Sequence, residues 1–221
     1  LKFLDANGSG STSDAIQAVN YATMMRNQYG QNVRVTNNSW GGGGSSSAMR
    51  QAIESGAEAD IVFIAAAGND GMNIDNNPQY PASYTSEAVI SVAATDRNDA
   101  LANFSNYGAT SVDLAAPGVG IVSTVPGNSY ASFSGTSMAT PHVAGAAALA
   151  LAVDPTLTVS QLRSGLLGTV DAVGDLAGKM VTGGRLNVGR LVESLASDPT
   201  VPLPPSGLNA SDGSTLGSVR I

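Results

Sequence analysis

The sequence of 221 residues contains no cysteine and only one histidine. The absence of cysteine excludes disulfide bonds, thiol catalysis and cysteine-ligated zinc. A single histidine also excludes a metal site built from several histidines of one chain. Charged residues make up 12% of the chain and aromatic residues 5%. The net charge of −7 argues against a surface that binds DNA or RNA, because such surfaces are basic.

Long hydrophobic runs are scarce as well. No run reaches the roughly 18 apolar residues that a membrane span needs, and the longest, Val143–Val153, is interrupted by Gly145. The first residue is Leu1 rather than methionine, and no signal peptide is recognisable after it. We therefore expect no membrane span, and we expect the sequence to begin within a longer protein.

The residues that are present follow the pattern of an α/β domain. A chain of this length can bury about 70% of its unfolded surface in one domain. Short apolar runs alternate with helical patterns, as in α/β units around a parallel sheet. Strands are expected at Lys2–Leu4, Val33–Asn37, Ile61–Ala67, Ala88–Ala94 and Val112–Ala115, with a hairpin over Ile121–Phe133. Helices are expected at Asp14–Arg26, Ser47–Glu54 (ended by Gly56), Ser137–Val153 and Asn187–Ala196, with another beginning after Thr158.

The composition changes after Ala196. Residues 1–196 are expected to form one domain, and residues 197–205 hold four prolines, which is typical of a stiff linker. Residues 206–221 are too few to fold alone. They are either a tail or the first strand of a fibronectin type III-like module, which the stretch from Pro204 to Ala210 resembles.

The segment Gly135–Gly145 carries the strongest chemical signal. Small residues lead Ser137 to the start of a long apolar helix, where unpaired N–H groups and the helix dipole suit a developing oxyanion. Pro141 should remove one helical hydrogen bond, the one to the carbonyl of Ser137. By itself, this pattern is also that of a capping serine before a buried helix.

Gly135–Gly145 resembles the nucleophile motif of the subtilisin-like serine peptidases, or subtilases. Further segments resemble that family in the same order and with matching spacing, namely Asn38–Gly42, Ala65–Asp70, Phe104–Gly108 and Ala116–Gly118. The resemblance extends from about residue 1 to residue 195. It implies an α/β fold of three layers, with a mostly parallel sheet between helices and without the family's N-terminal strands. It also implies hydrolysis of polypeptide substrates through an acyl-enzyme at Ser137.

The resemblance assigns roles to individual residues. Ser137 would attack the scissile carbonyl, while its own N–H and the side-chain amide of Asn69 would bind the oxyanion. Backbone for pairing with an extended peptide would come from Ser39, Trp40, Gly41 and Gly42. The pocket for the residue before the scissile bond would be lined by Ala66, Ala67 and Gly68. From the residues alone, Asn69 could equally serve a turn, and the glycines a flexible loop.

The catalytic base is missing from the sequence. A serine hydroxyl needs a base, and the base needs an orienting carboxylate. The single histidine, His142, follows Ser137 by five residues on the same expected helix and so points away from it. The subtilase order of Asp, His and Ser would put both missing motifs before Leu1. We therefore expect the C-terminal part of a longer secreted protease, inactive alone, with Asp and His supplied by an N-terminal fragment or a second chain.

Calcium is the cofactor that the resemblance suggests, as a structural ion only. Pro81, Ser83 and Asp113 match a calcium site of some subtilases, with two backbone carbonyls and one carboxylate. Calcium takes about six to eight oxygen ligands, so water or other groups would have to complete the site. A turn followed by a surface aspartate explains the same residues without a metal.

Two functions therefore remain open. The first is a subtilisin-like serine endopeptidase that acts outside the cell, as the resemblance implies. The second is a non-catalytic module that binds peptides or a protein partner along Ser39–Gly42. An esterase of the α/β-hydrolase class is disfavoured, because Ser137 lacks the Gly-x-Ser-x-Gly setting of those enzymes.

Overall fold

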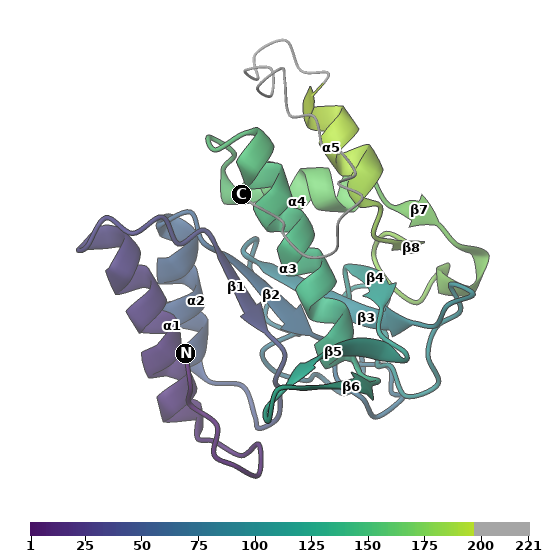
Figure 1. Cartoon of the computed structure of the whole chain (residues 1–221), viewed down its shortest axis with the longest axis horizontal. Helices are drawn as coiled ribbons and strands as arrows, with labels where there is room; N and C mark the ends of the chain where they lie inside the picture. The colour runs from purple at the N-terminus through teal and green to yellow at the C-terminus, as the bar shows by residue number, and fades with distance from the viewer. Residues whose placement is uncertain (197–221) are drawn as a thin grey trace.

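The structure is a computed structural model that describes residues 1–196 (Figure 1). Its main sheet has the strand order β1-β2-β3-β4-β8-β7. Neighbouring strands from β1 to β8 run parallel, and β7 pairs antiparallel with β8 at one edge. The strands are β1 (Val35–Asn38), β2 (Val62–Ala66), β3 (Val89–Thr95), β4 (Leu114–Pro117), β7 (Asp171–Ala172) and β8 (Gly184–Arg185).

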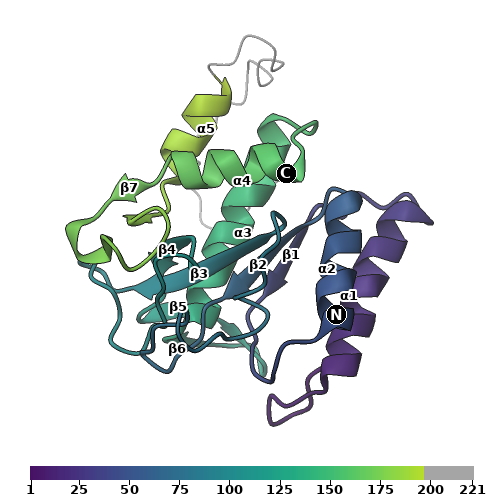
Figure 2. The same cartoon turned by 180° about the vertical axis from the view of Figure 1, so that it is seen from behind.

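Helices cover both faces of this sheet and complete the three layers that the sequence predicts. Alternate residues of β2 point to opposite layers: Phe63 and Ala65 pack with α1 and α2, whereas Val62 and Ile64 pack with α3, α4 and α5. Figure 2 shows α1 and α2 side by side, at the end of the sheet far from β7. The helices are α1 (Thr12–Asn27), α2 (Ser47–Glu58), α3 (Thr136–Val153), α4 (Val159–Gly168), α5 (Val188–Ala196) and the short 3-10 turn η1 (Gly174–Leu176).

The central strands are buried along their whole length. Every residue of β2 and of β3 is buried. This is the state expected of parallel strands covered on both faces, and it confirms what the continuous apolar runs Ile61–Ala67 and Ala88–Ala94 predict. The buried central strands therefore form a rigid support for the loops at the carboxyl edge of the sheet.

Side-chain caps determine where three helices begin. Ser11 accepts a hydrogen bond from the Asp14 N–H at the start of α1, and Ser46 accepts one from the Met49 N–H at the start of α2. At α4, Thr158 and Gln161 form the capping box that their spacing predicts, with each side chain bonded to the backbone N–H of the other residue.

Three features differ from the sequence-based predictions. Lys2–Leu4 is not a strand, because the described residues offer it no hydrogen-bonded neighbour. Helix α2 continues past Gly56, which is buried and lets α1 approach so closely that an added Cβ would lie 3.5 Å from Thr23 Oγ1. The chain turns only at Asp60, which has a φ of 55°. Strands β7 and β8 are not among the predicted strands, because two residues each are too few to show an alternation of apolar and polar side chains.

A separate hairpin lies beside the main sheet and confirms its predicted turn. Its strands are β5 (Ile121–Val125) and β6 (Ser129–Phe133), which pair antiparallel. Gly127 and Asn128 take φ values of 85° and 56° in the turn between them. Glycine and asparagine are the residues that adopt this left-handed conformation most readily.

Helix α3 is the one helix within residues 1–196 that is long and apolar enough, by length and composition, to cross a membrane. The expectation of no membrane span rested on the absence of an uninterrupted apolar run of about 18 residues, the longest being Val143–Val153. Core helices of sheet proteins pass the same test, and α3 packs against β1, β2, β3 and β4. The residues buried in that contact include Ala139, Val143 and Ala147. We therefore interpret α3 as the core helix of the sheet.

Candidate active site

Ser137 lies in the first turn of α3, at the carboxyl edge of the sheet. The helix begins at Thr136, directly after Gly135, whose N–H donates to the Gly118 carbonyl at 2.8 Å. Gly118 has no room for a side chain, because a Cβ there would lie 2.6 Å from Ala94 Cβ and 2.8 Å from the Gly135 carbonyl oxygen. This close approach fixes the start of α3 against the end of β4.

Asn69 lies across from the start of α3, with its amide held in one orientation. Its Oδ1 accepts hydrogen bonds from the Thr136 N–H at 2.8 Å and from the Thr136 hydroxyl at 3.0 Å. Because a backbone N–H can only donate, the bonded atom is the oxygen. The Nδ2 donor of this exposed residue is left for another acceptor. The Thr136 hydroxyl also accepts from the Gly68 N–H at 3.1 Å, which ties the end of β2 to α3.

Ser39 and Ser137 exchange hydrogen bonds. The Ser39 hydroxyl donates to the Ser137 carbonyl at 2.8 Å, and the Ser137 hydroxyl donates to the Ser39 carbonyl at 3.1 Å. The first bond replaces the helical one that Pro141 cannot make, since proline has no N–H. The second leaves the Ser137 hydroxyl bonded to a carbonyl, which cannot remove its proton.

Asn106 is a positioning residue that the sequence analysis missed. It is fully buried, and its Nδ2 donates to the Ala67 carbonyl at 3.0 Å. Its Oδ1 accepts from the N–H groups of Asp70 and Met72, each at 3.0 Å. These bonds hold the loop that carries Asn69. The segment around Asn106 is one of those that resemble subtilases, which is the signal that could have identified it.

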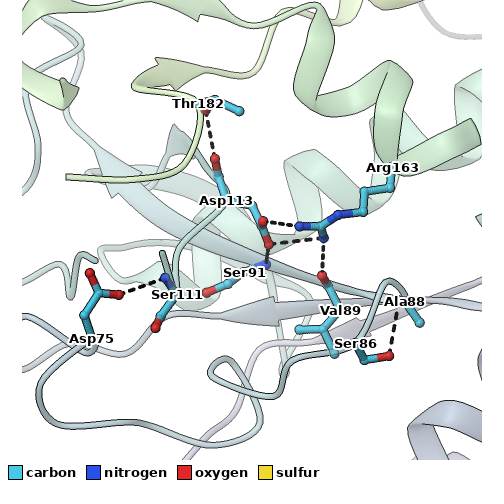
Figure 3. A network of polar contacts seen from close by, with 9 residues as sticks. All are labelled: Asp75, Ser86, Ala88, Val89, Ser91, Ser111, Asp113, Arg163 and Thr182. Atoms are coloured by element: carbon cyan, nitrogen blue, oxygen red, sulfur yellow. Dashed lines mark hydrogen bonds and ion pairs between the residues drawn. The ribbon is translucent and has the colours of Figure 1, made fainter. Parts of the chain in front are cut away.

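Asp75 holds the same loop at a second place (Figure 3). Its carboxylate accepts from the Thr110 hydroxyl at 2.8 Å and from the Ser111 N–H at 2.9 Å. Partial burial alone would raise the pKa of this carboxyl, but the hydrogen bonds from Thr110 and Ser111 outweigh it and hold the pKa below its ordinary value. The loop is narrow as well, because a Cβ at Gly68 would lie 2.4 Å from Asn106 Nδ2.

His142 does not serve Ser137. Its Nδ1 lies 2.9 Å from the Met138 carbonyl oxygen, so Nδ1 carries a proton and donates it to that carbonyl. The residue is exposed on α3, away from the first turn. It is also the only histidine of the chain. Within residues 1–196, therefore, no histidine is placed to accept the Ser137 proton.

A groove of about 760 Å³ opens beside β1. Phe3 and Leu4 line it together with Val19 and Met25 of α1. Strand β1 is an edge of the sheet, with no neighbour on this side among the described residues. Ser39, which is bonded to Ser137, is also among the residues that line the groove.

Comparison with known protein families matches residues 1–187 to the Subtilase family. The chain belongs to the subtilase family. Subtilisin DY of Bacillus licheniformis is 44% identical over 176 residues, which cover 79% of this chain and 61% of that protein. Alkaline elastase YaB of Bacillus sp. (strain YaB) is 42% identical over 79% of this chain and 43% of its own length.

A solved structure agrees with this assignment. The crystal structure of a cold adapted subtilisin-like serine proteinase superimposes with a TM-score of 0.75 at 35% identity, covering 85% of this chain and 65% of that one. The fold is therefore that of the subtilases. The present subtilase spans between 43% and 61% of the length of the two curated relatives named above.

The residues expected to bind substrate in this subtilase lie around Ser137 with different degrees of exposure. Gly41 and Gly42 are exposed, although the Gly42 N–H already donates to the Tyr80 carbonyl at 3.0 Å. The Trp40 ring packs edge-on against Phe3 and Phe63, with ring centroids 5.2 Å and 6.3 Å apart. The indole of Trp40 therefore packs against the core and lines the groove. Only the backbone of Trp40 remains beside the exposed Gly41 and Gly42.

The expected pocket residues at the end of β2 are mostly buried. Ala66 is 6% exposed and Ala67 is fully buried, while Gly68 is half-buried. The methyl groups of Ala66 and Ala67 are therefore hardly accessible to a ligand at the surface. The pocket assignment stays a prediction, and the open surface nearest to it begins at Gly68.

The expected calcium ligand Asp113 is bound by N–H groups (Figure 3). Its Oδ2 accepts from the Ser91 N–H at 2.8 Å, and its Oδ1 is ion-paired with the guanidinium of Arg163. Burial raises the pKa of the Asp113 carboxyl, although Arg163 and the Ser91 N–H act in the opposite direction. The carboxylate therefore already has a cation beside it.

This donor set does not fit calcium as it stands. Calcium requires oxygen ligands, whereas both oxygens of Asp113 already accept hydrogen bonds from N–H groups. The Pro81 carbonyl accepts a hydrogen bond from the Tyr84 N–H within its own turn, and Ser83 lines a cavity beside Asp113. No group of three His, Cys, Asp or Glu residues that could hold a metal ion occurs within residues 1–196. Calcium binding at these residues stays a prediction without structural support.

Proposed function

We propose that this subtilase contributes the nucleophile and the oxyanion-binding groups of a serine endopeptidase. Ser137 Oγ attacks the carbonyl carbon of a peptide bond, while its proton passes to a base. The Ser137 N–H and Asn69 Nδ2 bind the oxygen that becomes negative. The C–N bond breaks, and the amine leaves with the proton returned by the base. Water then hydrolyses the acyl-enzyme and regenerates the hydroxyl of Ser137.

The observation that carries this proposal is the fixed amide of Asn69. Two hydrogen bonds from Thr136 orient its oxygen away from the cleft, so the nitrogen is presented before any substrate arrives. A donor held in advance stabilises the transition state without the cost of reorganisation. A turn asparagine would not need contacts with the residue next to a nucleophile.

We further propose that a segment outside the described residues brings the base and its carboxylate, and that it packs into the groove beside β1. Three observations support this proposal. The groove has apolar walls, it runs along an unpaired sheet edge, and Ser39 is among the residues that line it. An extended segment could add to that edge as a strand and reach Ser137 at its end. A preceding part of the same protein and a separate fragment would fit equally well.

Labelling with a fluorophosphonate probe tests the catalytic proposal. The chain alone should react at Ser137 at least ~10³-fold more slowly than a subtilase that has its histidine base. Ser137→Ala should abolish the reaction. Asn69→Ala should slow the remaining reaction by ~10²–10³-fold, a magnitude known from subtilisin itself rather than one calculated for this chain. Rapid labelling of the chain alone would contradict the absence of a base.

A non-catalytic peptide-binding module is the second candidate. It is favoured by the Ser137 hydroxyl being bonded to a carbonyl, and by the exposed backbone at Gly41 and Gly42. Fluorescence polarisation with labelled extended peptides measures this directly. Affinity without turnover, unchanged in Ser137→Ala, would favour binding over catalysis.

An extracellular location is proposed on the family resemblance alone. Expression of the complete gene in a secreting host, followed by immunoblotting of cells and medium, tests it. Accumulation of the product in the cells alone would contradict it.

A further inference from the structure

Arg163 joins helix α4 to the middle of the sheet (Figure 3). Its guanidinium is ion-paired with Asp113 through one nitrogen, while the other donates to the Val89 carbonyl and lies 3.4 Å from Asp113 Oδ2. The side chain of Asp113 is 8% exposed and that of Arg163 is 25% exposed. A planar guanidinium with several donors can serve a carboxylate and a carbonyl at the same time.

Asp113 lies where several parts of the fold meet. Its carboxylate accepts from the Ser91 N–H of β3, and its carbonyl accepts from the hydroxyl and the N–H of Thr182, at 2.8 Å and 3.1 Å. Residue 113 also directly precedes β4. The Asp113–Arg163 pair therefore links β3, β4, α4 and the segment that leads to β8.

A carboxylate this deeply buried is costly unless a cation is close to it. The residues around Asp113 offer one cation, the guanidinium of Arg163. Its N–H groups point at the carboxylate oxygens that a metal ion would need, and the two positive charges would repel each other. A metal ion and this guanidinium would therefore compete for the carboxylate of Asp113.

A cavity of about 550 Å³ opens next to the pair. Four of the residues that line it carry a hydroxyl group, namely Ser83, Ser86, Thr110 and Ser111. The cavity also reaches Asp113 and Arg163 themselves. If the guanidinium were removed, the carboxylate would face hydroxyl groups and water, which are ligands that calcium accepts.

We infer that the guanidinium of Arg163 is the resident cation of this junction, in place of a metal ion. Calcium does not bind at Asp113 while Arg163 is present. When Arg163 is replaced by a small neutral residue, Asp113 becomes sensitive to calcium. This inference does not depend on the proposed peptidase activity, because it concerns the stability of the fold.

Thermal unfolding in calcium and in a chelator tests the inference, together with calorimetric titration by calcium chloride. Calcium should not raise the Tm of the wild-type chain through Asp113. Any change of Tm with calcium should therefore be the same in the wild type and in Asp113→Asn. Arg163→Ala should lower Tm in chelator on the order of 10 °C. Calcium should restore about half of that loss, and should restore none of it in the Arg163→Ala, Asp113→Asn double variant.

Two further variants make the test decisive. Arg50→Ala is the matched control, because Arg50 forms an exposed ion pair with Glu54 on α2, and its Tm should not change. Arg163→Lys keeps the charge and should retain most of the stability. If Arg163→Ala does not fold, the wild-type titration and Arg163→Lys still decide the matter.

A calcium response of the wild-type chain that disappears in Asp113→Asn would overturn the inference. So would a destabilised Arg163→Ala variant that calcium does not rescue, because the guanidinium would then not stand in for a metal ion. An equal loss of stability in Arg163→Lys and in Arg163→Ala would also overturn the inference. It would show that the hydrogen-bond geometry of the guanidinium, and not its charge, stabilises the buried carboxylate of Asp113.

Discussion

At the level of single residues, buried polar groups hold the groups of the proposed active site in place. Thr136 is fully buried and fixes the amide of Asn69, while Asn106 fixes the loop on which Asn69 stands. Neither residue is placed to touch a peptide. Their contribution is to keep donors in position before substrate arrives.

Replacing Asn106 tests this support. Asn106→Ala would remove four hydrogen bonds, of which the one to Asp70 Oδ2 is long at 3.5 Å, and would leave a buried carbonyl and two N–H groups without this partner. We expect the free energy of unfolding to fall by about 2–4 kcal/mol. Urea denaturation measures it, with the exposed Asn76→Ala as the control, which should change stability by less than about 0.5 kcal/mol. Equal effects of the two variants would contradict the role of Asn106.

Asp75 makes stability depend on pH. Its pKa in the folded chain lies below its ordinary value, because hydrogen bonds from Thr110 and Ser111 outweigh the effect of burial. The stabilisation is therefore present above the unfolded pKa of about 3.9 and is lost as pH falls through the lower folded pKa. Asp75→Asn should cost about 1–2 kcal/mol at pH 7, and this cost should decrease as the pH falls below the unfolded pKa of about 3.9.

Urea denaturation at several pH values measures this difference, with Glu58→Gln as a control. Glu58 is exposed on α2, so its substitution should have little effect at any pH. A cost of Asp75→Asn that stays constant between pH 7 and pH 3 would show that the charge of Asp75 is not what stabilises the loop.

At the level of elements, α3 lacks one internal hydrogen bond, and Ser39, the residue that follows β1, supplies a donor in its place. Pro141 cannot donate to the Ser137 carbonyl, so the Ser39 hydroxyl does. Ser39→Ala should therefore cost about 1 kcal/mol, whereas in a Pro141→Ala background it should cost little, because residue 141 then supplies the N–H. Unfolding of the two single variants and the double variant measures the coupling. Additive effects would argue against this exchange of partners.

Much of this arrangement could be predicted from sequence, because local chemistry determines it. The capping box at Thr158, the turn at Gly127 and the apolar run of β2 each depend on neighbouring residues alone. The identity of Ser137 and Asn69 came from resemblance, since a serine at a helix start is by itself ambiguous.

The remaining features depend on partners distant in the sequence. Gly56 reads as a helix end, and only the packing of α1 shows it to be a contact point. Arg163 reads as a surface residue of a helix, and only the fold brings it to Asp113. Lys2–Leu4 has the composition of a strand, yet a strand requires a neighbour that pairs with it. Each of these contacts joins residues far apart in the chain, which local patterns do not encode.

At the level of the whole molecule, an open sheet edge coexists with a net charge of −7. Unpaired edges favour association, and like charges oppose it. As the pH falls to about 4–5 the carboxylates become protonated, so we expect self-association to rise. Light scattering across pH 7 to 4.5 measures it. Asn37→Lys, which places a charge at the exposed position 37 of β1, should reduce association at pH 4.5, because a charged lysine on an edge strand disfavours strand pairing, and an unchanged signal would exclude the β1 edge as the contact.

The strand order also has a consequence during synthesis. Strands β1, β2, β3 and β4 are neighbours in the order in which a ribosome releases them, so each new strand finds its partner already present. Helix α3 packs on all four and emerges after them. The 98 positions that separate Ser39 from Ser137 take roughly 5–20 s to translate. Among the described residues of the proposed site, Ser137 is thus synthesised after Ser39, Asn69 and Asn106, so these groups come together only once α3 has been made.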